Sequence, residues 1–334
     1  ALAPPDSIAT PTLHVCAVRG NDRNSGRPEA PLQTLHAARD AARFLRHDLE
    51  GTGPSDAVEI VLHGKGVHRL TEPLELDERD SHSVYRAAAG EDVLVSGGIQ
   101  LDPASVQPRA GHTGQYEVNL TALGLRDLGT VLPNQSSPSH HTRTFAPLHP
   151  QLFIAEASNW LARWPNARNL TSWRWAYTKG CVSRNCSTAC NCSQDDIDGF
   201  SWRTSETNGS GVPPVVAHRW ADETDPYVHG YWRVDWRDGY LPLTGVDPAN
   251  DALLVGEAGA KAAPLEKVAT GSRYYAFNLL SELDADHEYY ISRSGETKGM
   301  LYFQPPKGTW PPPSGSSARA GAHVSSASHL IVLQ

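Results

Sequence analysis

The sequence lacks the features that mark chains which bind nucleic acid or cross a membrane. Its 29 lysine and arginine residues are outnumbered by 37 aspartate and glutamate residues, so the formal net charge is -8. Because phosphate binding needs a clustered basic face, we expect no nucleic-acid partner. No apolar run approaches the roughly 20 residues that span a bilayer, so we expect no membrane span.

Short catalytic motifs are also missing. The sequence has no glycine-rich phosphate-binding loop, no Gly-x-Ser-x-Gly nucleophile elbow and no Cys–His arrangement. The sequence therefore gives no sign of the enzyme classes that depend on these motifs, and we expect no cofactor.

Cysteine is scarce, and four of the five cysteines crowd into twelve positions: Cys181, Cys186, Cys190 and Cys192. Their C-x4-C-x3-C-x-C spacing lacks the two-residue knuckles typical of structural zinc. We therefore expect two disulfides, formed in an oxidising compartment. A bridge between the last two is sterically poor, so each of the first two should pair with one of them, in either order. The fifth, Cys16, is expected to be an inert buried thiol.

The middle of the chain is rich in Asn-X-Ser/Thr sequons, where chance would give roughly two. Their asparagines are Asn119, Asn134, Asn169, Asn185, Asn191 and Asn208. The opening "ALAPPDS" is similar to the stub left when a signal peptide is cleaved. These features predict a secreted, extracellular glycoprotein of the cell surface or wall. The alternative for the sequons is unmodified polar loop sequence.

Near the start of the chain, a turn leads into a short helix. Residues 20–26 are rich in turn-forming Gly, Asn and Asp, and Thr34 is placed to cap a helix. The apolar positions of this helix recur on one narrow face: Leu35, Ala38, Ala42 and Leu45. Such a face is too small to fill a globular core, so we expect the helix to lie across the end of another structure.

Short apolar runs between residues 58 and 101 predict strands: "VEIVLH", "GVHRL", "LEL", "SVYRA" and "VLVSGG". The first and fourth runs are separated by about 25 residues, the order of one coil in a parallel β-helix. Further on, turns and tryptophan-rich runs predict an antiparallel β unit. It ends in two strands, "EYYIS" and "MLYFQ", joined by a Gly-containing turn.

Three segments carry a resemblance to one family. The first segment matches at Gly20, Asp22, Gly26, Pro31, Leu32, Thr34, Leu35 and Ala38. The second is "LFIAEASNWLARWPN", with its turn at 163–166, and the third is residues 273–306. Together they resemble the carbohydrate-active right-handed parallel β-helix proteins, pectin-lyase-like in fold. Some of these are glycoside hydrolases with an inserted β-sandwich.

The resemblance implies a mainly β fold. It would consist of a cap helix, the first coils of a right-handed parallel β-helix, and an inserted antiparallel β-sandwich or barrel. The cap would shield the open apolar end of the stacked coils. The expected parts are a flexible N-terminus (1–12), cap and first coils (13–101), an inserted β-rich domain (102–310), a linker (311–328) and a strand resuming the β-helix (329–334).

Two acidic clusters are candidates for chemistry, because glycosidases use a pair of facing carboxylates. Carboxylate clusters also suit calcium, but like-charged clusters are usually solvated loops, and these lack the glycine and terminal glutamate of an EF-hand. In the family, the catalytic groups come from later coils. We therefore assign no catalytic residue and no metal site, and give the adjacent His140 and His141 no role. The clusters are Asp195, Asp196 and Asp198, and Asp222, Glu223 and Asp225.

Tryptophans are the candidates for carbohydrate binding, because an indole ring can stack on the apolar C–H face of a sugar. In "SWRWAY" and "YWRVDW" the aromatics alternate, which places same-face residues two apart on a strand. The alternative is burial in a core. The candidates are Trp173, Trp175, Trp202, Trp220, Trp232 and Trp236.

Two hypotheses follow. In the first, the chain is the N-terminal part of a secreted β-helix protein that acts on or binds extracellular polysaccharide. The resemblance then implies a glycoside hydrolase or polysaccharide lyase whose catalytic coils lie elsewhere, and this chain alone is expected to be inactive. In the second, it is a non-catalytic adhesive glycoprotein that assembles with other copies or with extracellular structural proteins into a wall, coat or filament.

Overall fold

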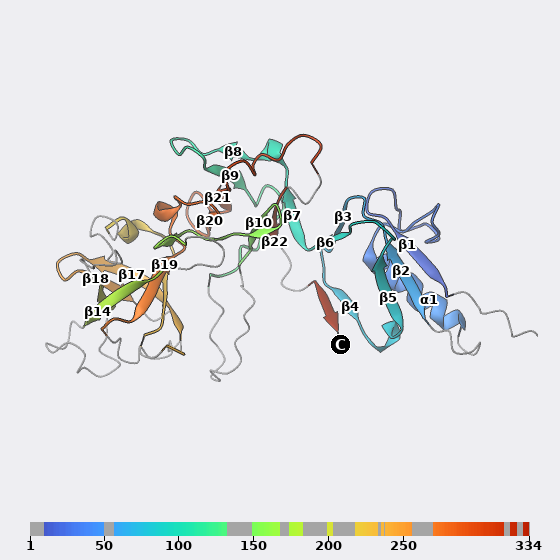
Figure 1. Cartoon of the computed structure of the whole chain (residues 1–334), viewed down its shortest axis with the longest axis horizontal. Helices are drawn as coiled ribbons and strands as arrows, with labels where there is room; N and C mark the ends of the chain where they lie inside the picture. Colours follow the sequence, from blue (N-terminus) through green and yellow to red (C-terminus); the bar gives the residue numbers. More distant parts are fainter. Residues whose placement is uncertain are drawn as a thin grey trace, which may run out of the picture. The chain divides into compact units, whose positions relative to one another are not determined.

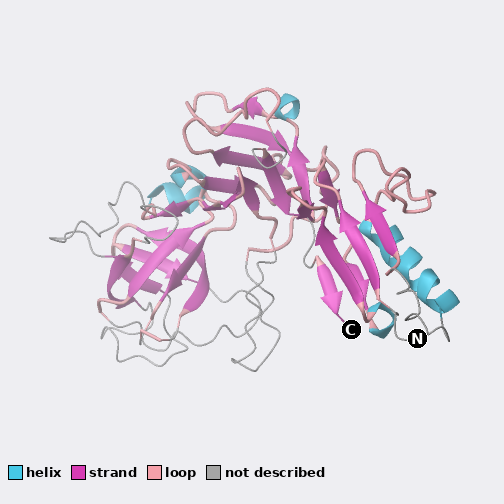
Figure 2. Ribbon diagram, turned by 45° about the vertical axis from the view of Figure 1, so that its right-hand side comes forward, coloured by secondary structure: helices cyan, strands magenta, loops and turns pink. Residues whose placement is uncertain are grey.

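A computed structural model describes residues 10–49, 57–131, 149–167, 174–182, 199–202, 218–232, 235–236, 238–255, 270–316, 321–325 and 330–333. They belong to two compact units: unit 1 comprises Ala1–Gln100 and Pro312–Gln334, and unit 2 comprises Leu101–Pro311. The described residues are mainly β, as predicted, and include one α-helix (Figure 2). That helix is not long and apolar enough to cross a bilayer.

Unit 1 is built from short parallel strand pairs and a helix (Figure 1). Its elements are β1 (Thr12–Val15), α1 (Leu35–Leu49), β2 (Val58–Leu62), β3 (Val67–Arg69), β4 (Leu74–Leu76), the 3₁₀-helix η1 (Glu78–Asp80), β5 (Ser83–Ala87), β6 (Leu94–Ser96), β22 (Ala322–Ser325), β23 (Ile331–Leu333) and β7 (Gly98–Leu101), which runs into the first residue of unit 2.

Three parallel pairings follow one another along unit 1. β2 pairs with β5, β3 pairs with β6, and β4 pairs with β23 from the far end of the sequence. β1 adds to the other edge of β2. Val58 of β2 lies opposite Ser83 of β5, so the predicted repeat spacing matches the pairing register.

The turn at the start of unit 1 is fixed by backbone contacts that exclude other residue types. A Cβ on Gly20 would lie 2.1 Å from the Leu32 carbonyl oxygen, and Gly26 has a φ of +77°. The Asp22 carboxylate accepts hydrogen bonds from the backbone N–H groups of Gln33 and Thr34, each at 2.8 Å. Thr34 Oγ1 in turn accepts from the Ala37 N–H at 3.1 Å and caps α1, as predicted.

The predicted apolar face of α1 packs on the strands of unit 1. Leu35, Ala38 and Ala42 are buried in one cluster with side chains of β1 and β2, and Leu45 is partly buried against it. α1 therefore lies against β1 and β2 (Figure 1). This accounts for a face made mostly of alanine, because small side chains allow a close approach to a sheet.

Unit 2 contains a ring of antiparallel strands. The sheet order is β13-β19-β14-β15-β18-β17-β16, and β16 also pairs with β19, which closes six of the strands on themselves. The strands are β13 (Arg163–Trp164), β14 (Ala176–Val182), β15 (Gly199–Trp202), β16 (Tyr227–Gly230), β17 (Gly239–Asp247), β18 (Ala252–Val255) and β19 (Arg273–Phe277).

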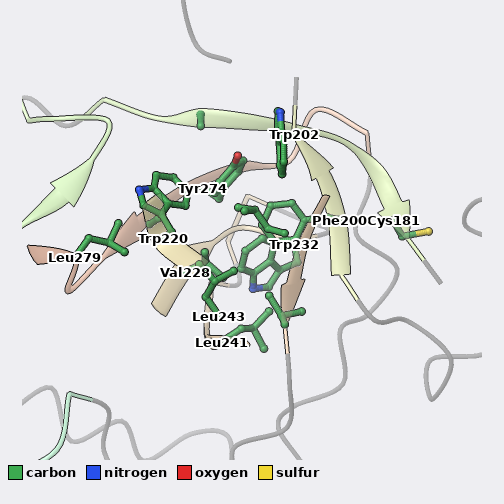
Figure 3. Close-up of a cluster of buried hydrophobic side chains, with 14 residues drawn as sticks. Cys181, Phe200, Trp202, Trp220, Val228, Trp232, Leu241, Leu243, Tyr274 and Leu279 are labelled. Atoms are coloured by element: carbon green, nitrogen blue, oxygen red, sulfur yellow. The ribbon is translucent and has the colours of Figure 1, made fainter. Parts of the chain in front are cut away.

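The interior of this closed sheet is filled by large aromatic and aliphatic side chains (Figure 3). Phe200, Trp202 and Tyr274 are fully buried there. The Trp232 ring covers a pair of facing glycines, since a Cβ on Gly230 would lie 2.8 Å from that ring. The closed sheet thus has a dense core and an outer face.

A second sheet of unit 2 has the order β12-β20-β21-β9-β8. The two predicted C-terminal strands, β20 and β21, form an antiparallel pair within it. The remaining elements are β8 (Gln107–Pro108), β9 (Tyr116–Asn119), β10 (Leu152–Ile154), β11 (Ala157–Ser158), β12 (Trp160–Leu161), β20 (Glu288–Ile291), β21 (Met300–Gln304) and the 3₁₀-helices η2 (Pro103–Ser105), η4 (Trp220–Asp222) and η5 (Leu280–Glu282).

Candidate functional site

The structure places the candidate tryptophans in different environments. Trp202, Trp220 and Trp232 lie in the core of the closed sheet, where other side chains cover their rings. Trp175 is half-buried on the outer face, and Trp236 is 84% exposed. Trp173 lies outside the described residues.

An aromatic patch covers part of the outer face of the closed sheet. Side chains alternate along each strand, so Val228 and Tyr274 point into the core while their neighbours His229 and Tyr275 point outward. His229 lies opposite Tyr275 on one side and Tyr240 on the other. We call Trp175, His229, Tyr231, Tyr240 and Tyr275 the outer aromatic patch.

The rings of the outer aromatic patch are in mutual contact. The His229 ring centroid lies 4.3 Å from that of Tyr240 and 5.0 Å from that of Tyr275. Trp175 lies 5.4 Å from Tyr275 and meets Tyr231 edge-on at 5.7 Å. His229 at its centre is buried, Trp175, Tyr231 and Tyr275 are half-buried, and Tyr240 is 38% exposed.

Polar groups border these rings. His229 Nε2 lies 2.9 Å from the Asp238 carboxylate, and the Arg273 guanidinium lies 4.1 Å from the Tyr231 ring centre. The buried Arg163 guanidinium lies 3.7 Å from the Tyr275 ring centre. Burial raises the pKa of Tyr275 above its ordinary value. Aromatic faces beside hydroxyl, carboxylate and guanidinium groups form a surface suited to a polyhydroxylated ligand.

Unit 2 also contains a cleft of about 540 Å³. Its walls come from the segment between β8 and β9, from η4 and the residues after it, from η5, and from β20 and the turn that follows. The charged side chains that line it are Arg109, Arg219, Asp222, Glu223 and Asp284.

The acidic cluster 222–225 lies at this cleft, but two of its carboxylates are held by structural contacts. Glu223 accepts hydrogen bonds from the backbone N–H groups of Leu280 and Ser281 at 3.0 and 2.7 Å, which ties η5 to η4. Asp225 accepts a 2.6 Å bond from Asn278 Nδ2, and burial raises its pKa to about 6. The expectation of a merely solvated loop therefore does not describe this segment. The other cluster, Asp195, Asp196 and Asp198, lies outside the described residues.

The sequence did not predict most residues of the outer aromatic patch or of the cleft. His229, Tyr231 and Tyr275 of the outer aromatic patch are signalled by alternating aromatics in "YVHGYW" and "RYYAF", whereas Tyr240 lies in neither segment. Arg109, Arg219 and Ser281 of the cleft come from separate segments that no short motif connects.

The predicted modification sites are mostly outside the described residues. Asn119 is exposed at the end of β9, whereas Asn134, Asn169, Asn185, Asn191 and Asn208 lie in undescribed segments. Cys181 is buried in β14 and Cys16 is buried, while Cys186, Cys190 and Cys192 fall in an undescribed segment, as do His140 and His141. Glycosylation and the two disulfides stay predictions.

Comparison with known proteins yields a similarity of fold. No protein-family model matches the sequence, and no curated protein matches it. A solved structure described as "Glycoside hydrolase" superposes with a TM-score of 0.63 over 97% of this chain, at 18% sequence identity. The match covers 48% of that protein, so this chain spans about half its length.

A second solved structure is titled "The complex structure of XylC with xylose". It aligns over 84% of this chain and 33% of its own length, at 14% identity and a TM-score of 0.29, which is too low to indicate a shared fold. The chain is therefore similar in fold to about half of a protein described as a glycoside hydrolase.

Proposed function

We propose that this chain is the N-terminal part of a secreted, carbohydrate-active parallel β-helix protein, and that unit 2 binds extracellular glycan through the outer aromatic patch. The fold similarity to a protein described as a glycoside hydrolase supports the first half of the proposal. The observation that carries the second half is the aromatic patch itself.

The strand pairing of unit 1 supports a β-helix. β2, β3 and β4 follow one another in the sequence, and each pairs in parallel with a later strand, β5, β6 and β23 respectively. Two successive coils of three strands produce this pattern, with unit 2 inserted into the second coil between β6 and β23. In this arrangement α1 is the cap of the first coil.

The outer aromatic patch supports glycan binding. A pyranose ring presents an apolar C–H face and a rim of hydroxyl groups, and the patch presents aromatic rings bordered by Asp238 and Arg273. A structural role alone would not require aromatic side chains on an outer face that keeps Tyr240 38% exposed.

Binding is tested with the purified chain against immobilised plant, algal and bacterial polysaccharides, comparing wild type with Trp175→Ala. We expect the variant to bind at least tenfold more weakly, a loss of about 1.4 kcal/mol, because it removes the largest ring of the patch. Phe44→Ala is the matched control, since Phe44 is an exposed aromatic residue of α1 in unit 1, outside the patch. If Trp175→Ala and wild type are retained equally, and circular dichroism shows both to be folded, the patch does not bind glycan.

A further inference from the structure

The cleft of unit 2 has fixed hydrogen-bond donors. Arg219 Nη2 donates to Glu282 Oε1 at 3.0 Å, and this buried carboxylate also accepts from Trp220 Nε1 at 2.8 Å. Arg109 Nη1 donates to Gln115 Oε1 at 2.7 Å, and its guanidinium lies 4.8 Å from the Tyr302 ring centre. An arginine has five N–H donors in a rigid plane, so these contacts orient both groups and leave donors for a ligand.

An unsatisfied hydroxyl lies at the same cleft. Ser281 is a lining residue, and its Oγ is buried without a hydrogen-bond partner among the described residues. A buried hydroxyl left unpaired costs free energy. Rotation of the Ser281 side chain to another χ1 rotamer would bring the hydroxyl to a ligand hydroxyl in the cleft. The buried side chains of Leu283 and Tyr290, which also line the cleft, add apolar surface.

The charge of the cleft limits which ligands fit. The cleft is lined by two guanidinium groups, Arg109 and Arg219, and by three carboxylates, Asp222, Glu223 and Asp284. A further negative charge, such as the carboxylate of a uronic acid, would enter a cleft whose charged side chains are already net negative. A neutral sugar hydroxyl both donates and accepts hydrogen bonds, which matches a mixed set of donors and acceptors.

We propose that this cleft is a glycan subsite separate from the outer aromatic patch and that it selects neutral sugar residues over uronic acid residues. The inference rests on the proposed function, because it names the kind of sugar that the glycan-binding unit takes. The volume of about 540 Å³ lies within the range of about 300–1,000 Å³ typical of small-ligand sites.

The first test is calorimetric titration of the full chain with two sets of soluble oligosaccharides of matched length. The neutral set contains glucose, xylose, mannose and galactose oligomers, and the acidic set contains oligogalacturonate and oligomannuronate. We expect a neutral oligomer to bind at least tenfold more tightly than any acidic one. Binding of acidic oligomers alone overturns the inference and leaves the proposed function intact, whereas binding of no oligomer counts against both.

Ser281→Ala then locates the binding. Loss of the hydroxyl should lower the affinity for the neutral oligomer five- to tenfold. The melting temperature should stay equal or rise, because an unsatisfied buried group is removed. Ser81→Ala, at an exposed position in unit 1, is the matched control. In Asp222→Asn/Asp284→Asn, the preference for neutral over acidic oligomers should shrink at least fivefold. If both cleft variants bind as wild type while Trp175→Ala does not, the cleft inference is wrong and the patch stands.

Discussion

At the scale of single residues, buried polar groups are the main feature of unit 2. Glu288 is fully buried and accepts hydrogen bonds from three backbone N–H groups, those of Arg163, Asp284 and Ala285. It therefore joins the "RWPN" turn to the segment before β20, and both belong to the motifs that resemble the β-helix family. This contact gives Arg163 and Glu288 a structural role.

Glu288 should make stability depend on pH. Burial, which outweighs the amide hydrogen bonds, raises the pKa of Glu288 to about 8 from an ordinary value of 4.5. The folded chain then holds a proton that the unfolded chain releases, so this contribution to stability is fully present below about pH 4.5 and is lost as the pH rises through about 8.

Thermal unfolding from pH 4.5 to 8.5 checks this dependence. Relative to wild type, Glu288→Gln should gain about 2–4 kcal/mol of unfolding free energy across that range, because it has no proton to lose. The absolute stability of the variant is not decisive, since its amide group also changes the hydrogen bonds. Glu296→Gln, at an exposed turn, is the control. Parallel pH profiles for Glu288→Gln and wild type would contradict the prediction.

The sequence could limit the candidates for sugar binding only to tryptophans in general. Alternation in "SWRWAY" and "YWRVDW" assigns side chains to two faces but does not say which face is the core. Trp175 and Trp202 were therefore equal candidates, although one lies on the outer face and the other is fully buried. The choice depends on β16 pairing with β19, a contact between distant segments.

At the scale of elements, the helix and strands of unit 1 could be predicted from local sequence patterns. The α1 cap and its narrow face, the five strand runs and their repeat interval depend on turn chemistry, helical period and strand period, which are all local. The contact between α1 and η1 could not be predicted from the sequence. Arg43 Nε donates to Asp80 Oδ1 at 2.9 Å, and the Asp80 side chain is only 3% exposed.

We expect Arg43→Ala to lower the unfolding free energy of unit 1 by about 2–3 kcal/mol, because it leaves a buried carboxylate without its charged partner. Urea unfolding measures the change. Arg39→Ala is the matched control on the same helix, since Arg39 pairs with Asp40, which is 60% exposed, and also donates a 3.2 Å hydrogen bond to the Glu75 carbonyl oxygen. An exposed ion pair of this kind contributes at most about 1 kcal/mol. Similar losses in the two variants would mean that the Asp80 contact does not hold α1 in place.

At the scale of the whole molecule, each unit has its own hydrophobic core, and the chain spans about half of the solved protein that it resembles. Of the carboxylates at and near the cleft, Glu223 holds η5, Glu282 holds Arg219 and Trp220, and Asp284 accepts a 2.7 Å bond from Asn166. Glycoside cleavage needs two carboxyl groups free to act as acid and as nucleophile or base.

The last prediction is that this chain binds glycan without cleaving it. Rate enhancement depends on catalytic groups held in position at the reacting bond. Two of the three cleft carboxylates, Glu223 and Asp284, are instead held by backbone N–H groups and by Asn166. The purified chain should therefore release no reducing ends and no unsaturated products from the polysaccharides that it retains. Glu223→Gln should lower the melting temperature of unit 2, because a neutral amide holds the two η5 N–H groups more weakly. Turnover by wild type that Glu223→Gln or Asp222→Asn abolishes, with both variants folded, would place a catalytic pair in the cleft and contradict the assignment of unit 2 to binding.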